Sequence, residues 1–218
     1  MAVTAPTPTR SGLRSVLLAV IAVGLVLLGG GLAVVLGIGR DDAAGPGAVD
    51  VGFSRDMARH HLQGVEMANL AQDHSVDPAV RGLAFDIATT QNNQVGRMEG
   101  WLALWGYSPT GGDVMGWMGG SAHSGHGSDG GTLMPGMATE EELANLRSLQ
   151  GTAFDVEFLR LMMRHHQGGL EMAEYAQEHG ETDVVRTLAR SIAESQKAET
   201  RLMSGMLEER GGTPLPAP

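Results

Sequence analysis

The chain has 218 residues, a formal net charge of −10 at pH 7, 13 methionines and no cysteine. The lack of cysteine excludes disulfide bonds, thiolate metal sites and a cysteine nucleophile. With Lys197 as its single lysine, the acidic chain lacks the basic face that nucleic-acid binding requires. Aromatic residues make up only 4%, and a core of Leu, Val, Ala and Met favours helices over a β-sandwich.

The first predicted element is an apolar helix. Residues 15–38 form an uncharged run of 24 residues, and roughly 20 suffice to cross a bilayer core. We predict a transmembrane signal anchor here, after a cytoplasmic N-terminus at residues 1–14 that carries Arg10 and Arg14. A cleaved signal peptide is the alternative, although its apolar core usually spans about 7–15 residues. Either reading exports the remainder, as a single-pass membrane protein or as a secreted one.

The rest of the chain contains an internal duplication. A shift of 105 residues aligns residues 50–102 with residues 155–207 without a gap, and nearly half of the positions are identical. The identical pairs include Phe53/Phe158, Met57/Met162, His60/His165, His61/His166, Gly64/Gly169, Met67/Met172, Gln91/Gln196 and Met98/Met203.

Each copy predicts two helices. After a linker at residues 39–49, the first hairpin occupies residues 50–106, with helices at about 50–74 and 77–105 that Asp50 and Asp77 can cap. Residues 139–210 hold a short helix that begins in a capping box at Thr139, and then helices at about 152–179 and 182–209. Asp155 also reads as a cap, and we expect residues 211–218 to be a disordered tail.

Between the copies, residues 107–138 form a Met-, His- and Gly-rich segment that we expect to be a loop. Two helical hairpins joined by one long crossover predict an all-α fold, a ferritin-like four-helix bundle preceded by one transmembrane helix. A pseudo-two-fold axis between the copies would bring their matching residues to the same depth.

Two stretches carry the chemistry, "RHHLQGVEMA" at residues 59–68 and "RHHQGGLEMA" at residues 164–173. At about 100° per residue, His60 lies on the apolar stripe beside Met57 and Met67, and His61 lies on its shoulder. Gly64 lies at the centre of the stripe and allows close approach of a neighbouring helix. The second copy repeats the pattern.

Imidazole and thioether together are a ligand set for copper, and imidazole also suits zinc. The candidate metal ligands are therefore Met57, His60, His61, Met67, Met162, His165, His166 and Met172. The alternative is structural: buried histidines often serve backbone hydrogen bonds, and helical methionines often only fill a core. We expect Glu66 and Glu171 to face solvent or an arginine.

The loop repeats this chemistry with His123 and His126, which we add to the candidate ligands. Its methionines, Met115, Met118, Met134 and Met137, have no core to fill if the segment is a loop. Plain low-complexity sequence is the alternative reading.

Several enzyme classes are excluded because the sequence lacks their motifs. A di-iron site requires Glu-x-x-His on two helices, and no histidine here has a glutamate three residues before it. The zincin, nucleophile-elbow and P-loop motifs are also missing. We therefore predict a protein that is not an enzyme, with a copper-dependent redox enzyme as a minor alternative.

The stretch "FDVEFLRLMMRHHQGGLEMAEYA" at residues 154–176, with "ATEEELANLRSLQG" before it, resembles the bacterial domain of unknown function 305 family over nearly all of residues 50–210. The resemblance implies a ferritin-like fold and, for some members, an exported copper-binding protein linked to copper resistance. By position, the proposed Met and His ligands of the family fall on the eight bundle residues named above.

These observations predict an extracytoplasmic, membrane-anchored protein that binds copper for buffering, resistance or delivery. Its expected partners are the metal ion, the membrane and a copper-transfer protein, with no nucleic acid. A non-catalytic structural or protein-interaction bundle with structural histidines is the alternative.

Overall fold

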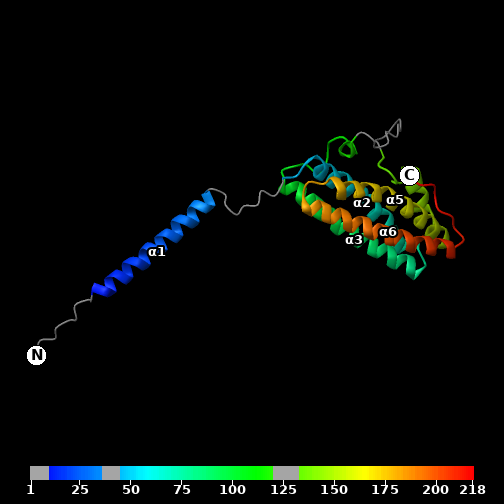
Figure 1. The fold of residues 1–218 in the computed structure, drawn as a ribbon. Helices are drawn as coiled ribbons and strands as arrows, with labels where there is room; N and C mark the ends of the chain where they lie inside the picture. Colours follow the sequence, from blue (N-terminus) through cyan, green and yellow to red (C-terminus); the bar gives the residue numbers. More distant parts are fainter. Residues whose placement is uncertain (1–9, 36–44, 120–132) are drawn as a thin grey trace, which may run out of the picture. The chain divides into compact units, whose positions relative to one another are not determined.

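The structure is a computed structural model that describes residues 10–35, 45–119 and 133–218 (Figure 1). In these ranges all regular structure is helical, with six α-helices, one 3₁₀ helix and no strand. The all-helical prediction is therefore confirmed. The chain divides into two units, Met1–Ala43 and Ala44–Pro218, and each is treated separately.

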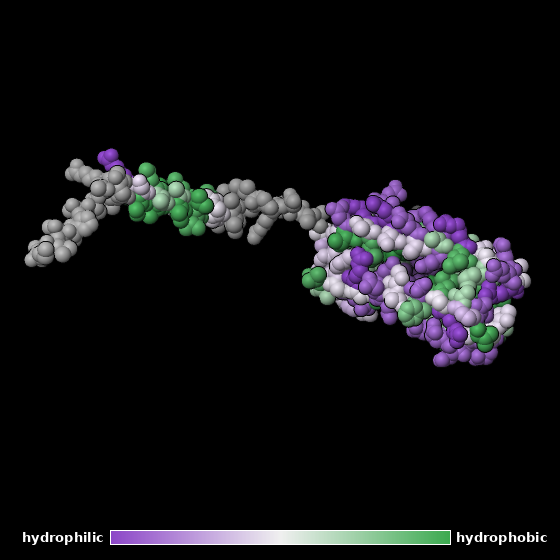
Figure 2. Space-filling view, turned by 90° about the horizontal axis from the view of Figure 1, so that it is seen from below, coloured by the Kyte–Doolittle hydropathy of each residue, from purple (hydrophilic) through white to green (hydrophobic). Residues whose placement is uncertain are grey.

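Helix α1 (Arg10–Val35) is the single helix of the described residues that is long and apolar enough to cross a membrane, over Arg14–Leu32. Its Leu, Val and Ile side chains are exposed, with Leu28 at 73% and Val26 at 72%. Figure 2 shows that this surface is largely hydrophobic, whereas the surface of the second unit is more hydrophilic. A helix that is apolar on all sides requires an apolar environment.

The second unit contains two long hairpins, each built by one copy of the repeat. Helices α2 (Ala48–His74) and α3 (Pro78–Leu104) form the first, and helices α5 (Gly151–His179) and α6 (Asp183–Glu209) form the second. Between them lie the 3₁₀ helix η1 (Gly116–Met118) and helix α4 (Glu140–Ser148). In each hairpin the two helices pack against each other, and α2 also packs against α5 (Figure 1).

Two helices of the second unit, α3 and α4, begin at an N-cap residue whose side chain accepts a hydrogen bond from the first turn. Asp77 caps α3, accepting from the Ala79 N–H at 2.8 Å, and Thr139 and Glu142 form the predicted capping box of α4. Asp50 is wrongly predicted as the N-cap, because Gly47 is the N-cap and α2 begins at Ala48; Asp50 is the third helical residue, and its Oδ2 accepts from the Gly47 N–H at 2.9 Å. Asp155 lies inside α5 and caps nothing.

Helices α2 and α5 run in opposite directions. At one end, Asp50 of α2 accepts from Thr182, which follows α5 in the chain, at 2.8 Å. At the other end, His74 Nδ1 lies 2.8 Å from the carbonyl of Leu149, which precedes α5. The antiparallel arrangement places equivalent residues of the two copies opposite each other near the middle of both helices.

Apolar side chains form two separate clusters, one toward each end of the second unit. The first cluster contains the buried methionines Met57, Met98, Met115, Met134 and Met172, together with Phe53 and Trp117. The second contains Met67, Met162, Met163, Met203 and Met206, together with Phe154 and Phe158. We call them the Met57 cluster and the Met67 cluster.

The expectation that the loop methionines have no core to fill is wrong: Met115 and Met134 belong to the Met57 cluster, and Met118 and Met137 pack against it. Met115 is 8% exposed and Met134 is 2% exposed. The start of the connection is fixed by Asp56, whose Oδ2 accepts from the Met115 N–H at 2.7 Å and from Trp117 Nε1 at 2.8 Å. Burial of Trp117 against Phe53 and Tyr175 therefore draws Met115 into the core.

Candidate metal centre

The four paired histidines meet inside the second unit. His60, His61, His165 and His166 are all completely buried, at 0% exposure. The rings of His60 and His165 contact each other in a tilted arrangement, with centroids 3.8 Å apart and an interplanar angle of 32°. His61 lies 6.4 Å from His60, and His166 lies 6.3 Å from His165. The duplication thus gathers the histidines into one layer. The helical spacing placed His61 at the edge of the apolar stripe, but His61 is as deeply buried as His60.

Each ring is fixed through its Nε2 atom. His60 Nε2 lies 3.1 Å from the Pro135 carbonyl, and His165 Nε2 lies 3.0 Å from the His60 carbonyl. His61 Nε2 lies 2.7 Å from Gln94 Oε1, and His166 Nε2 lies 2.6 Å from Glu199 Oε2. Since carbonyl and carboxylate oxygens only accept, each Nε2 carries a proton, and a ring protonated at Nε2 alone keeps a lone pair on Nδ1.

All four Nδ1 atoms are buried and have no hydrogen-bond partner among the described residues. A buried polar atom without a partner is costly, and native structures usually supply a protein group, a water or an ion. Four bare imidazole nitrogens in one layer fit the needs of a metal ion that prefers nitrogen ligands. The donor set of this layer therefore fits copper.

Burial keeps three of these imidazoles, His60, His61 and His165, neutral. Desolvation, with a smaller contribution from the charge of His166, lowers the pKa of His60 to about 4. Desolvation and the neighbouring His60 lower the pKa of His61 to about 3. The same two causes hold the pKa of His165 well below its ordinary value. A metal ligand must be deprotonated, so these rings are ready to bind at neutral pH.

Two glycines and two glutamines complete the layer. A Cβ at Gly64 would overlap the Gln91 amide and lie 3.1 Å from Cε1 of His165. A Cβ at Gly169 would lie 2.8 Å from Gln196 Nε2 and 3.1 Å from Cε1 of His60. Each glycine therefore makes room for the histidine of the other copy, as its place on the apolar stripe predicts. Gln91 Oε1 and both polar atoms of the Gln196 amide have no partner in the described part of the chain.

The candidate thioether ligands flank the histidine layer on both sides. Along α2, Met57 precedes the histidine pair and Met67 follows it; along α5, Met162 precedes the pair and Met172 follows it. Met57 and Met172 share the Met57 cluster, and Met67 and Met162 share the Met67 cluster. The layer therefore lies between two groups of five buried methionines. His123 and His126 lie outside the described residues.

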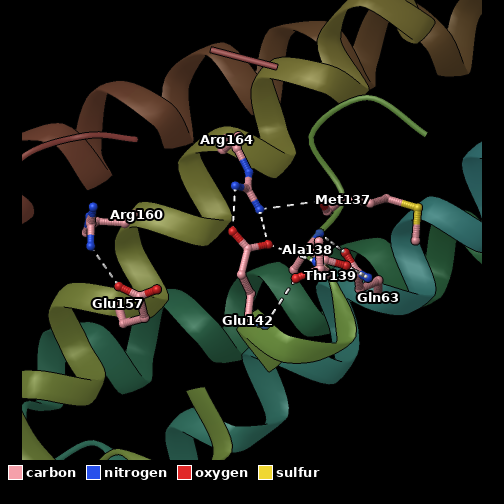
Figure 3. A network of polar contacts seen from close by, with 8 residues as sticks. All are labelled: Gln63, Met137, Ala138, Thr139, Glu142, Glu157, Arg160 and Arg164. Carbon is pink, nitrogen blue, oxygen red and sulfur yellow. Dashed lines mark hydrogen bonds and ion pairs between the residues drawn. The ribbon is translucent and has the colours of Figure 1, made fainter. Parts of the chain in front are cut away.

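The segment of residues 134–138 closes one side of the layer. The amide of Gln63 in α2 holds Ala138 through two hydrogen bonds of 2.7 and 2.9 Å. Arg164 of α5 pairs with Glu142 at 2.6 and 2.8 Å and also reaches the Met137 carbonyl (Figure 3). These contacts hold Pro135 where its carbonyl accepts from His60.

Carboxylates are sparse around the layer. Within residues 10–35, 45–119 and 133–218, no group of three or more His, Asp or Glu side chains is arranged as a metal cage. Glu66 is exposed and pairs with Arg147, and Glu171 is also exposed, as expected. Any ion held in the layer would rely on imidazole and thioether groups, which are ligands for soft metals.

Sequence reasoning missed the residues that orient the histidines. Gln91 and Gln196 stand out as identical residues of the repeat, and their glutamine type on a buried helical face was an available signal. Gln94 and Glu199 occupy one repeat position and differ, and only the packing of α3 on α2 and of α6 on α5 shows their role.

The fold and the site define an internally duplicated helical protein with a buried histidine layer between methionine clusters. Residues 50–207 match the model of the domain of unknown function DUF305, and the chain belongs to this family.

Solved structures agree with this assignment. A DUF305 protein from Streptomyces coelicolor, predicted to be secreted, is 43% identical, with a TM-score of 0.70 over 77% of this chain and 97% of that one. A DUF305 fragment from Deinococcus radiodurans is 33% identical, with a TM-score of 0.63 over 76% and 99%. CopM in its Cu(I)-bound form is 25% identical, with a TM-score of 0.57 over 73% and 96%. CopM is also solved with Cu(II) and with silver. No curated protein matches the chain significantly.

Proposed function

We propose that this protein is a membrane-anchored, extracytoplasmic copper-binding protein that buffers copper, confers resistance to it or delivers it to a transfer protein. Its second unit would be a ferritin-like four-helix bundle with a pseudo-two-fold axis through the histidine layer. One observation carries the proposal: four buried imidazoles present Nδ1 atoms without a hydrogen-bond partner between two clusters of methionine.

Copper fits this layer better than the harder metals. Thioethers favour Cu(I), and imidazoles serve both oxidation states of copper. The similarity to CopM, which is solved with Cu(I), Cu(II) and silver, supports the same class of ion. Magnesium and calcium prefer oxygen ligands, which imidazole and thioether groups do not supply.

The export part of the proposal rests on α1. A 19-residue window, Arg14–Leu32, has the length and composition of a membrane span, and Arg10 and Arg14 lie on its N-terminal side. The similar Streptomyces coelicolor protein, which is predicted to be secreted, supports export. An uncleaved anchor would keep the copper-binding unit at the outer face of the membrane.

The test is a titration of the full chain in detergent with Cu(I), Cu(II) and Zn(II) against chromophoric chelators. We expect binding tighter than micromolar for copper and a loss of at least about tenfold when His60 and His165 are replaced by Ala. His179→Ala removes a half-exposed histidine and serves as the control. Weak binding that is unchanged in the double variant would refute the proposal. If the double variant lowered only the Tm, the histidines would have the structural role described as the alternative.

The protein would bind and release the ion without catalysis. Copper-loaded protein should therefore show no turnover of a cuprous or phenolic substrate above that of free copper. Sustained turnover that disappears in the double histidine variant would favour a redox enzyme.

A further inference from the structure

Apolar and aromatic side chains gather on one side of α3 near its C-terminal end. Leu104 is 83% exposed, the highest value among the large apolar residues of the described part of the chain. At about 100° per residue, four residues lie within about 100° of one another around the helix: Arg97, Trp101, Leu104 and Trp105. We call these four residues the α3 face.

The two tryptophans of the α3 face are held by contacts on both sides. Their rings stack with centroids 6.2 Å apart, and the Arg97 guanidinium lies 5.4 Å from the Trp101 ring. Trp101 and Trp105 are half-buried, and their inner sides pack against the Met57 cluster. The core of the unit therefore supports two rings that are partly open to the surface.

The same end of α3 lies beside the first residues of the second unit. Tyr107, which follows α3 and is 43% exposed, lines one surface hollow together with residues 46–48. The Arg55 guanidinium lies 5.7 Å from the Tyr107 ring. The end at which the chain enters the unit therefore carries three aromatic rings and two arginines.

We propose that the α3 face, together with Tyr107 and Arg55, rests on the lipid surface of the membrane that holds the anchor. This interaction is separate from the binding of the ion, and its partner is the layer of lipid headgroups and the outer ends of the acyl chains. The inference rests on one part of the proposed function, the uncleaved anchor.

Chain length keeps this end of the unit near the membrane. Pro46 follows Ile38, the last residue of the uncharged run, by eight positions, and a chain of that length spans at most about 29 Å. Helix α2 has 27 residues, so the far end of the unit, at Val76, lies about 40 Å from the start of the helix. A short tether makes the encounter of the entry end with lipid intramolecular, so a weak affinity is sufficient.

The residue types of this surface suit the boundary between membrane and water. Trp and Tyr are enriched there because their rings are apolar and carry one polar group. Arginine adds attraction to anionic headgroups, and its apolar stem can lie along the acyl chains.

Charge determines which side of the unit can approach the lipid. The chain has a net charge of −10, so anionic headgroups repel most of its surface. Glu99 of α3 lies about 160° from Trp101 around the helix, away from the α3 face. Asp113 lines the hollow beside Tyr107, which favours contact through the side of α3 over contact through the hollow.

The experiment measures tryptophan emission of the full chain in vesicles of phosphatidylcholine and phosphatidylglycerol. Brominated lipid of the same headgroups quenches a tryptophan only on contact. The control variant, Trp101→Phe with Trp105→Phe, keeps only Trp117, which is 8% exposed. Addition of Val76→Trp to this variant places a probe at the far end of the unit, where Val76 is 72% exposed.

We expect brominated lipid to quench the native emission by about a third or more, because two of the three tryptophans lie at the lipid surface. Both control variants should keep their emission. Leu104→Asp should reduce the quenching of the native tryptophans by at least about twofold, because a carboxylate is costly among acyl chains. Val76→Asp is its matched control and should change nothing. Circular dichroism checks that every variant keeps its helices.

The possible failures differ in what they overturn. If an alkaline wash removes the chain from the vesicles, the anchor and this inference both fail. If the chain is retained but the native emission is not quenched, this inference fails and the proposed function stands. If chemical crosslinking also shows a dimer in that case, a second copy covers the α3 face in place of lipid. Equal quenching in Leu104→Asp and Val76→Asp would likewise contradict a contact through the α3 face.

Discussion

The imidazole rings of His60 and His165 lie 3.8 Å apart, although 105 residues separate them in the chain. Two imidazolium ions at this distance inside the protein would repel each other strongly, so the stack requires neutral rings. The antiparallel packing of α2 on α5, with glycines 64 and 169 beside the rings, is what brings them together. Stability and the proposed metal binding therefore involve the same pair.

The neutral histidines predict a loss of stability in mild acid. Their pKa values in the folded state, about 4 for His60 and about 3 for His61, lie below the value of 6.5 in the unfolded chain. Below about pH 6.5 the unfolded chain therefore binds more protons, and the free energy of unfolding falls by about 1.4 kcal/mol per pH unit for each such histidine. The loss continues until the pH reaches the folded values.

Urea unfolding at several pH values between about 7 and 5 measures this slope above the range where ordinary carboxylates titrate. His61→Gln should reduce the slope because it removes one of the neutral histidines, and the half-exposed His179→Gln should leave it unchanged. A free energy of unfolding that stays constant across this range would contradict the neutral-histidine interpretation.

Alanine substitution should change stability in opposite directions at two glycines: Gly168, which packs against residues 134–138, and Gly205, which has open space around it. A Cβ at Gly168 would overlap the Pro135 carbonyl and lie 2.7 Å from the Gly136 nitrogen, both backbone groups that cannot rotate away. Gly168→Ala should therefore displace the segment, break the contact between Pro135 and His60, and cost about 1–3 kcal/mol. Gly205→Ala, in open space on α6, should stabilise the chain by about 0.5–1 kcal/mol. Thermal unfolding checks both, and equal effects of the two substitutions would mean that the segment does not pack as described.

The duplication made much of the helical arrangement predictable. Because His60 and His165 occupy the same repeat position, their meeting follows from any two-fold packing of the copies, and Gly64 and Gly169 mark the close approach. The predicted helix starts lie within a few residues of the observed ones where the sequence contains a capping residue, as at Asp77 and Thr139. Asp50 misled the prediction because its carboxylate caps from inside the helix, at the third position.

The connection between the copies was not predictable from its composition. Gly- and Ser-rich sequence indicates a loop, and nothing local to Met115 or Met134 shows that Asp56 and Gln63 fix its ends onto α2. The Pro135 contact to His60 breaks the symmetry of the repeat, so comparison of the copies could not find it. Non-local contacts of this kind are set by tertiary packing, which overrides local composition.

The matched aspartates of the repeat predict unequal effects on stability. Asp50 is fully buried and accepts four hydrogen bonds, from Gly47, Glu181 and twice from Thr182. Asp50→Ala leaves these donors unpaired and should cost about 1–3 kcal/mol. Asp155, at the equivalent position, is 2% exposed and its Oδ1 has no partner, so Asp155→Ala should cost less or even stabilise. The midpoints of urea unfolding would show the difference, and a larger loss at Asp155 would contradict it.

Methionine-to-leucine substitutions separate packing from metal binding. Leucine nearly conserves the volume of methionine, so a buried exchange should cost less than about 1.5 kcal/mol in stability. It removes the sulfur, and a thioether that binds Cu(I) cannot be replaced by a hydrocarbon. The double variant Met57→Leu, Met172→Leu changes the two methionines that flank the histidine layer within the Met57 cluster. We expect its Cu(I) affinity to fall by at least about tenfold, with a smaller change for Cu(II), which depends more on imidazole.

The matched control is Met163→Leu with Met206→Leu, two buried methionines of the Met67 cluster that are not candidate ligands. Equal Cu(I) affinity in both double variants, with both folded, would show that Met57 and Met172 only fill the core.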